Sequence, residues 1–108
     1  MSREVWLTDG AARDLDELYA AAYDRGGSAQ ADLFLDRIQD LLRRIADEAS
    51  PARSVPELHR LGLADGRVLR DGELRLLYRE RESDALLVLV ADQGRSMQSL
   101  LQRRMLDT

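Results

Sequence analysis

The chain has 108 residues, of which 44% are hydrophobic and 33% charged, and its formal net charge is −4. This length suits one globular domain, and the composition is not that of a disordered chain. The lack of cysteine excludes disulfides and thiolate metal sites, and a single histidine gives little basis for a histidine-centred metal site.

Charge is distributed unevenly along the sequence. Residues 1–50 contain six arginines and eleven acidic residues, whereas residues 51–108 contain ten arginines and nine acidic residues. The negative net charge argues against nonspecific binding of nucleic acid. All 16 basic residues are arginine, a bias that a GC-rich genome would also produce. The C-terminal half nevertheless holds many planar donors suited to phosphate or carboxylate.

The ends and the apolar runs bear on localisation. The N-terminal MSREVW lacks a basic segment followed by an apolar stretch, so we expect no signal peptide. No apolar run approaches the length that spans a bilayer. We therefore expect one cytoplasmic domain, residues 1–108, that needs no metal or cofactor and does not associate with a membrane.

The first half of the chain predicts a strand and two helices. Residues 3–7 alternate as a short strand does, and Thr8 or Asp9 suits a helix start. Apolar residues then recur at helical spacing on both sides of Gly26-Gly27, a pair that predicts a turn between helices. Two amphipathic helices joined in this way form an antiparallel helical hairpin.

The second half predicts three strands and a short helix. Residues 67–70 and 74–78 read as strands around Asp71-Gly72, a strong signal for a tight hairpin. Residues 86–90 form a continuous apolar run, which predicts a central or doubly covered strand, and residues 96–106 read as a helix. The expected fold is α+β, in the order β-α-α-β-β-β-α. We expect an antiparallel sheet with the N-terminal helical hairpin packed on one face.

Four segments, in this order and spacing, resemble the RelE/ParE superfamily of bacterial toxins. They are Trp6-Leu7-Thr8 with Ala12 and Asp14-Leu15, then Val55–Leu58, then Leu74–Arg79, and finally Ala91 to Leu106. The last resembles the ParE-like, plasmid-stabilisation branch, except that Gln93-Gly94-Arg95-Ser96 replaces the Gly-Arg-Arg-Asp usual there. The departure removes one basic and one acidic side chain where the last strand leads into the final helix.

The resemblance implies the toxin component of a type II toxin–antitoxin module, neutralised by a cognate antitoxin in a hetero-oligomer. A disordered C-terminal segment of such an antitoxin would fold on the toxin. We expect part of its docking surface in a groove between the helical hairpin and the sheet, formed by Leu33, Ile38 and Leu42.

One activity that the resemblance implies is RelE-like, metal-independent cleavage of mRNA on the ribosome. The RNA supplies the nucleophile, so the protein must supply a base, an acid and cations. The candidates are Glu57 (or His59) as base, with Arg75 and Arg95 as the other catalytic residues. The segment 93–95 holds no side chain that is a competent acid near neutral pH.

The activity that we favour is ParE-like inhibition of DNA gyrase, which requires binding rather than chemistry by the toxin. The candidate binding residues for the target are Arg67, Arg70, Tyr78, Arg79, Arg103 and Arg104. Two of these assignments have structural alternatives. Arg67 and Arg70 are three apart and point to opposite faces of a strand, so they form one clamp only if a bulge turns one of them. Tyr78 alternates with Leu74 and Leu76, so it is also a candidate core residue. A third reading is a non-toxic protein that binds an antitoxin and regulates its own operon.

Overall fold

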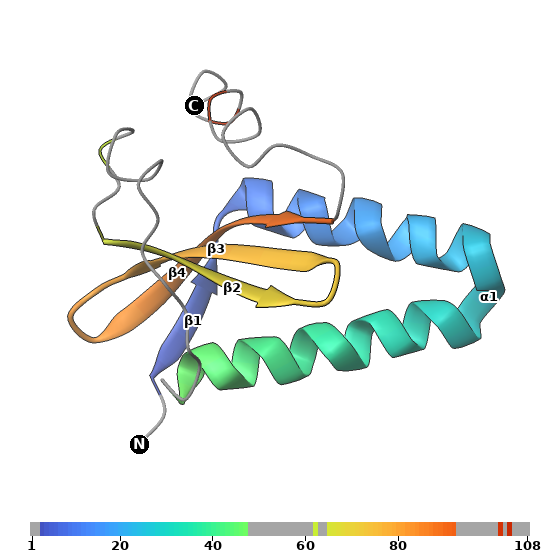
Figure 1. Cartoon of the computed structure of the whole chain (residues 1–108), viewed down its shortest axis with the longest axis horizontal. Coiled ribbons are helices and arrows are strands. Elements are labelled where there is room, and N and C mark those ends of the chain that lie inside the picture. Colours follow the sequence, from blue (N-terminus) through green and yellow to red (C-terminus); the bar gives the residue numbers. More distant parts are fainter. Residues whose placement is uncertain (1–2, 48–61, 63–64, 93–101, 103, 105–108) are drawn as a thin grey trace.

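The computed structural model describes residues 3–47, 62, 65–92, 102 and 104. Strand β1 (Glu4–Leu7) leads into the long helix α1 (Asp9–Ala46). Strands β2 (Gly66–Asp71), β3 (Leu74–Glu80) and β4 (Asp84–Ala91) follow. The α+β class expected from the sequence is confirmed (Figure 1).

Helix α1 begins where the sequence predicted. Thr8 is the N-cap in extended backbone, and its side chain accepts a hydrogen bond from the Ala11 amide at 3.0 Å. This bond satisfies one of the amides that the first turn leaves without a helical partner.

The predicted turn between two helices is a sharp kink inside α1. Gly26 and Gly27 both leave helical backbone angles, and Gly27 has a φ of 71°. That left-handed region costs glycine little and other residues more, so the glycine pair reverses the chain. Two arms of α1 therefore run back alongside each other, as predicted for the helical hairpin (Figure 1).

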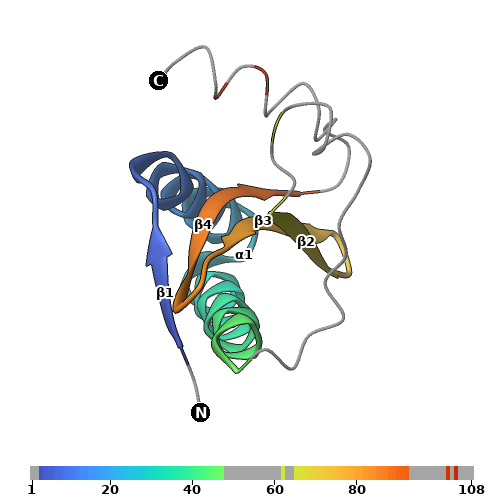
Figure 2. The same cartoon turned by 90° about the vertical axis from the view of Figure 1, so that its left-hand side faces the viewer.

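The sheet corrects one expectation. Its strand order is β1-β4-β3-β2, with β2·β3 and β3·β4 antiparallel, but β1 pairs with β4 in parallel. The sheet is thus mixed (Figure 2). After α1 the chain forms β2 at the far edge of the sheet, then β3, and finally β4 beside β1. β4 runs in the same direction as β1. The apolar run of β4 is central, as predicted.

The main core lies between the sheet and both arms of α1. Its members are Ala11, Ile38, Leu41, Ile45, Leu69, Leu74, Leu76, Tyr78, Ala85, Leu87 and Val90. Val68, Leu77 and Leu89 are also buried, although strand alternation places them on the opposite face of the sheet, here called the outer face. Both faces of the central strands are therefore buried.

The β2–β3 turn is fixed from α1. Gly72 has a φ of 60°, as the first position of a tight hairpin turn requires. Arg37 donates to the Asp71 carboxylate at 2.8 Å and to the Asp71 carbonyl. A Cβ on Gly72 would lie 2.6 Å from Arg37 Nη2, so a side chain there would displace the Arg37 guanidinium from its place beside the turn.

The helix predicted over residues 96–106 lies outside the described residues, except that Gln102 and Arg104 are helical. Within the described ranges, no helix is long and apolar enough to cross a membrane. Those same ranges hold no cluster of three histidine, cysteine, aspartate or glutamate residues placed to bind a metal ion.

Candidate functional site

Three of the predicted binding or catalytic arginines share the outer face of the sheet. Arg70 lies opposite Arg75 across β2 and β3, and Arg79 follows Arg75 at the next-but-one same-face position of β3. Like charges directly opposite one another repel, so this pair needs compensation. Arg75 donates to the Asp92 carbonyl at 2.8 Å, which orients its guanidinium toward the end of β4.

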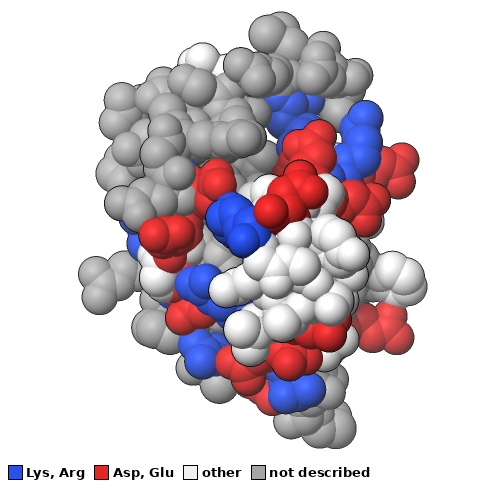
Figure 3. Space-filling model, turned by 90° about the vertical axis from the view of Figure 1, so that its right-hand side faces the viewer, with Lys and Arg blue, Asp and Glu red and all other residues white. Residues whose placement is uncertain are grey.

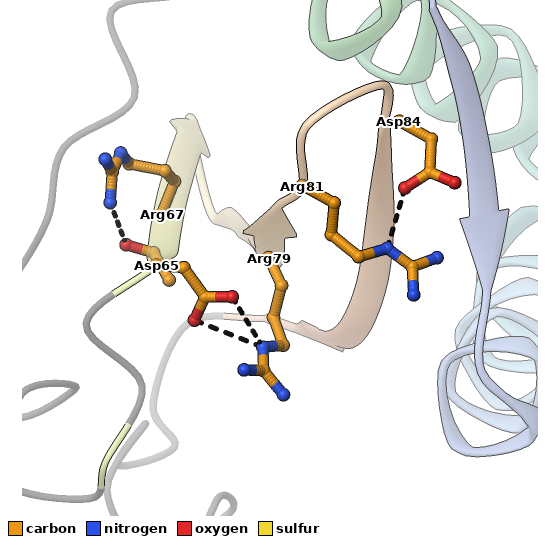
Figure 4. A network of polar contacts seen from close by, with 6 residues as sticks. Asp65, Arg67, Arg79, Arg81 and Asp84 are labelled. Atoms are coloured by element: carbon orange, nitrogen blue, oxygen red, sulfur yellow. Dashed lines mark hydrogen bonds and ion pairs between the residues drawn. The ribbon is translucent and has the colours of Figure 1, made fainter.

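Arg79 and the neighbouring Arg81 each carry a carboxylate on one edge of the guanidinium. Arg79 Nε lies 3.0 and 3.2 Å from the two Asp65 oxygens, and Arg81 Nε lies 2.7 Å from Asp84. Figure 4 shows both guanidinium groups on the same side of the strands. Both arginine side chains remain half-exposed, so the two ion pairs stabilise their positions only weakly.

Arg67 and Tyr78 lie on the face toward α1, opposite the face that carries Arg70. The prediction that Arg67 and Arg70 occupy opposite faces is therefore confirmed. Tyr78 is 3% exposed within the main core, as its alternation with Leu74 and Leu76 indicated. Its phenol is turned away from solvent, so the proposed role in target binding does not fit this conformation.

Arg3 joins the surroundings of Tyr78 to the end of α1. Its two terminal nitrogens donate to the Glu80 carboxylate at 2.9 and 3.2 Å, and its Nε donates to the Ile45 carbonyl at 3.2 Å. The Arg3 amide donates to the Ala46 carbonyl at 2.9 Å, and its guanidinium lies 6.0 Å from the Tyr78 ring centroid. Arg3 thus donates to two carbonyls near the C-terminus of α1, and its positive charge complements the negative end of the helix dipole.

These contacts shift two pKa values in opposite directions. The hydrogen bonds from Arg3 hold the pKa of Glu80 below its usual value, and burial only partly opposes them. Burial, followed by the negative charge of Glu80, raises the pKa of Tyr78 above its usual value. The phenol therefore stays neutral around pH 7 and the carboxylate stays charged.

Arg104 lies at the edge of β4 and not on the outer face. Its terminal nitrogens donate to the Val88 carbonyl and to Asp14 Oδ1, each at 2.7 Å. Four other candidates, Glu57, His59, Arg95 and Arg103, lie outside the described residues, and their roles stay predictions.

The three residues expected to bind the antitoxin do not share one surface. Leu33 is 63% exposed, Ile38 is 4% exposed within the core, and Leu42 packs partly buried against it. Five helical steps separate Leu33 from Ile38 by about 140° around the axis, which turns them to different sides. The grouping is corrected: Ile38 is buried in the core whereas Leu33 is exposed, so the two residues do not form one docking surface.

Exposed apolar side chains of α1 lie nearer its kink. Tyr23 and Leu35 flank the turn at Gly26-Gly27, and both are exposed, as is Leu33. Figure 3 views this end of the molecule and shows an uncharged area bordered by acidic and basic side chains. Single exposed apolar residues are ordinary, and nothing bound here identifies what would cover them.

Sequence analysis missed several residues that organise the site. Asp14 was named only within a segment that resembles the family, and Arg3, Arg37, Asp65 and Glu80 were given no role. Their partners are distant: 77 positions separate Arg3 from Glu80, and 34 separate Arg37 from Asp71. The predicted strand over 74–78 stopped short of Glu80. Its alternation, continued to the observed end of β3, places Glu80 on the same face as Tyr78, near Arg3.

The strand, the kinked helical hairpin and the three-stranded meander define a RelE/ParE-like fold. Solved structures with this fold include the chromosomal ParDE toxin–antitoxin system of P. aeruginosa, with 17% identity and a TM-score of 0.61. The RelBE2 toxin–antitoxin complex of Mycobacterium tuberculosis has 20% identity and a TM-score of 0.62. Each match covers 86% of this chain and, respectively, 98% and 100% of the other chain.

Residues 5–97 match the family described as ParE toxin of type II toxin–antitoxin system, parDE. The match covers most of the chain, so this protein belongs to that family. It is a toxin of the type II toxin–antitoxin class. A comparison with curated proteins finds no match.

Proposed function

We propose that this protein inhibits DNA gyrase and that a cognate antitoxin neutralises it by forming a hetero-oligomer with it. Membership of the ParE toxin family supports the ParE-like activity over the RelE-like one. The structurally similar ParDE and RelBE2 proteins are toxin–antitoxin systems, which supports an antitoxin as partner.

The surroundings of Arg75 support a protein as the target. Its register partners are Arg70 and Ala91, and its same-face neighbour along β3 is Leu77. Arginines beside buried apolar residues are typical of a surface that binds protein, where arginine is enriched and anchors contacts. Tyr78, the strand's tyrosine, points into the core and away from these arginines.

A RelE-like endoribonuclease is the alternative, with Glu57, Arg75 and Arg95 as its catalytic residues. It would draw its base and its third catalytic residue from outside the described residues. A non-toxic protein that binds antitoxin is the second alternative.

Pulse-labelling after induction in bacterial cells separates these functions. Thymidine incorporation should stop before methionine incorporation if replication is the target. Earlier loss of methionine incorporation would support the nuclease, and Glu57→Ala with Arg75→Ala should then restore growth. Unchanged incorporation of both labels would support the non-toxic protein.

Arg70 offers a sharper test of the proposed surface. Arg70→Glu reverses an exposed charge on the outer face and should weaken inhibition of gyrase at least about tenfold, a typical effect at a contact residue. Arg13→Glu makes the same change at an exposed position of α1 and should have no effect. Equal potency of the two variants would remove Arg70 from the target surface.

A further inference from the structure

Strand β4 extends past the end of β1 and leaves part of its edge without a neighbouring strand. Leu7, the last residue of β1, is in register with Leu87, whereas β4 continues to Ala91. The β3·β4 register shifts so that Tyr78 pairs with Leu87 and Leu77 pairs with Leu89, which leaves Val88 as a bulge. Buried backbone groups along this edge need other partners.

Thr8 and Asp14, at the start of α1, supply some of those partners. The Thr8 amide donates to the Leu87 carbonyl at 3.0 Å, and the Thr8 hydroxyl donates to the Val88 carbonyl at 3.3 Å. The Val90 amide donates to Asp14 Oδ2 at 3.0 Å. Figures 1 and 2 show the start of α1 next to this end of β4.

Arg104 completes the arrangement from the far end of the chain. It donates to the Val88 carbonyl and to Asp14 Oδ1, each at 2.7 Å, so Asp14 holds the β4 edge with one oxygen and Arg104 with the other. The side chains of Arg104 and Asp14 are only 21% and 15% exposed. Such a pair is screened far less than the ion pairs on the surface.

The fold also leaves space for this guanidinium. A Cβ on Gly10 would lie 2.4 Å from Arg104 Nη1 and 2.8 Å from its Cζ. Gly10 is buried in the first turn of α1, where glycine lowers helix propensity. A side chain at position 10 would displace the Arg104 guanidinium, so glycine suits this position although it does not favour the helix.

Arg104 contacts the strand that precedes it in the sequence. β4 ends at Ala91, and Arg104 donates to the Val88 carbonyl of that strand. Arg95 and Arg103, two of the predicted functional arginines, lie between these residues in the sequence.

We propose that Arg104 is a positioning residue, which fixes the helical positions Gln102 and Arg104 against the rest of the toxin by binding Asp14 and the Val88 bulge. This inference rests on the proposed function, because the C-terminal arginines then belong to the surface that binds the target. Arg104 was predicted to contact the target itself; the geometry points instead to a role within the toxin. Inhibition of the target then depends on the ion pair between Arg104 and Asp14.

A spin label tests the clamp without reference to the target. The chain has no cysteine, so Gln102→Cys gives a single labelling site at an exposed helical position two residues before Arg104. Asp14→Asn keeps an acceptor for Val90 but removes the charge, and Arg104→Met removes the guanidinium while keeping an extended side chain. Asp16→Asn is the matched control, because Asp16 is an exposed carboxylate on the same helix.

We expect Asp14→Asn and Arg104→Met to increase label mobility and to lower inhibition of the target at least about tenfold. The double variant should be no worse than either single variant, since both remove one interaction. Unchanged label mobility in both single variants would overturn the clamp, even if activity fell. Inactive wild-type protein would refute the proposed target, whereas label mobility would still decide the clamp.

Discussion

At the scale of single residues, Arg3 joins parts of the chain that are far apart in sequence. It binds Glu80 at the end of β3, the Ile45 carbonyl near the end of α1, and the face of Tyr78. Arg3 is 8% exposed and Glu80 is 37% exposed, so the pair is shielded mainly on the arginine side. Loss of the Arg3 side chain would remove the hydrogen bond to the Ile45 carbonyl together with the ion pair to Glu80.

Glu80→Gln should make stability less dependent on pH. Because Arg3 lowers the pKa of Glu80 in the folded protein, the stabilisation is full above the unfolded pKa, about 4.3, and is lost as pH falls through the folded value. At pH 7 the variant should be less stable by about 1 kcal/mol or less, given the exposure of Glu80. Urea unfolding at pH 7 and pH 3 measures this; an equal difference at both pH values would contradict it.

Two leucines of α1 test which side of the second arm is buried. Leu41 is fully buried and Leu33 is 63% exposed. Leu41→Ala should cost about 2–5 kcal/mol through lost burial and a residual cavity, whereas Leu33→Ala should change stability by about 0.5 kcal/mol or less. Chemical unfolding of both variants provides the comparison. Similar costs would mean that the arm is rotated relative to the structure.

At the scale of elements, the kink of α1 determines how the two arms meet the sheet. Gly27 has a φ of 71°, and a Cβ there would meet no atom within 4 Å. Backbone strain is therefore the whole cost of a side chain at this position. Gly26 differs, because its φ is negative and a Cβ there would instead meet the side chain of Gln30.

Gly27→Ala should destabilise the protein by about 1–3 kcal/mol, the cost of a backbone region that is essentially restricted to glycine. Gly27→Asn should cost about as much, because a ψ of −160° lies outside the left-handed helical region that asparagine tolerates. Thermal unfolding monitored by circular dichroism ranks the three proteins. A neutral Gly27→Ala variant would indicate that the arms are joined by another backbone geometry.

The elements themselves were largely predictable from local patterns. Apolar spacing at helical period, the Gly26-Gly27 pair and Asp71-Gly72 identified the helical hairpin and the β2–β3 turn. The parallel pairing of β1 with β4 was not predictable, because 80 residues separate Glu4 from its partner Asp84 and no local signal encodes strand direction. The core role of Tyr78 followed from the same two-residue alternation that defines a strand.

At the scale of the whole molecule, the candidate site was only partly predictable. Local alternation separated Arg67 from Arg70 by face, but the grouping of Leu33 with Ile38 ignored their angular separation around the helix. Asp14 and Arg104 contact each other across 90 positions, which no spacing reveals. Long-range ion pairs depend on the complete tertiary arrangement, so the sequence identified the class of protein better than its contacts.

The whole fold also accounts for how a chain with net negative charge can present arginines. Acidic residues predominate in the first half, which contains α1, whereas β2 and β3 carry Arg70, Arg75 and Arg79 on one face. Strand alternation gathers these cations, and carboxylates such as Asp65 only partly compensate them. A surface with local positive charge is compatible with a net charge of −4.

Gyrase activity with the purified toxin tests the central claim most directly. DNA supercoiling by gyrase should fall as toxin is added, and cleaved DNA should accumulate in the same reaction. Addition of the cognate antitoxin before the toxin should prevent both effects, while Arg70→Glu should require more protein and Arg13→Glu should match wild type. Unchanged supercoiling with no cleaved DNA, at toxin concentrations that arrest growth in cells, would contradict gyrase as the target.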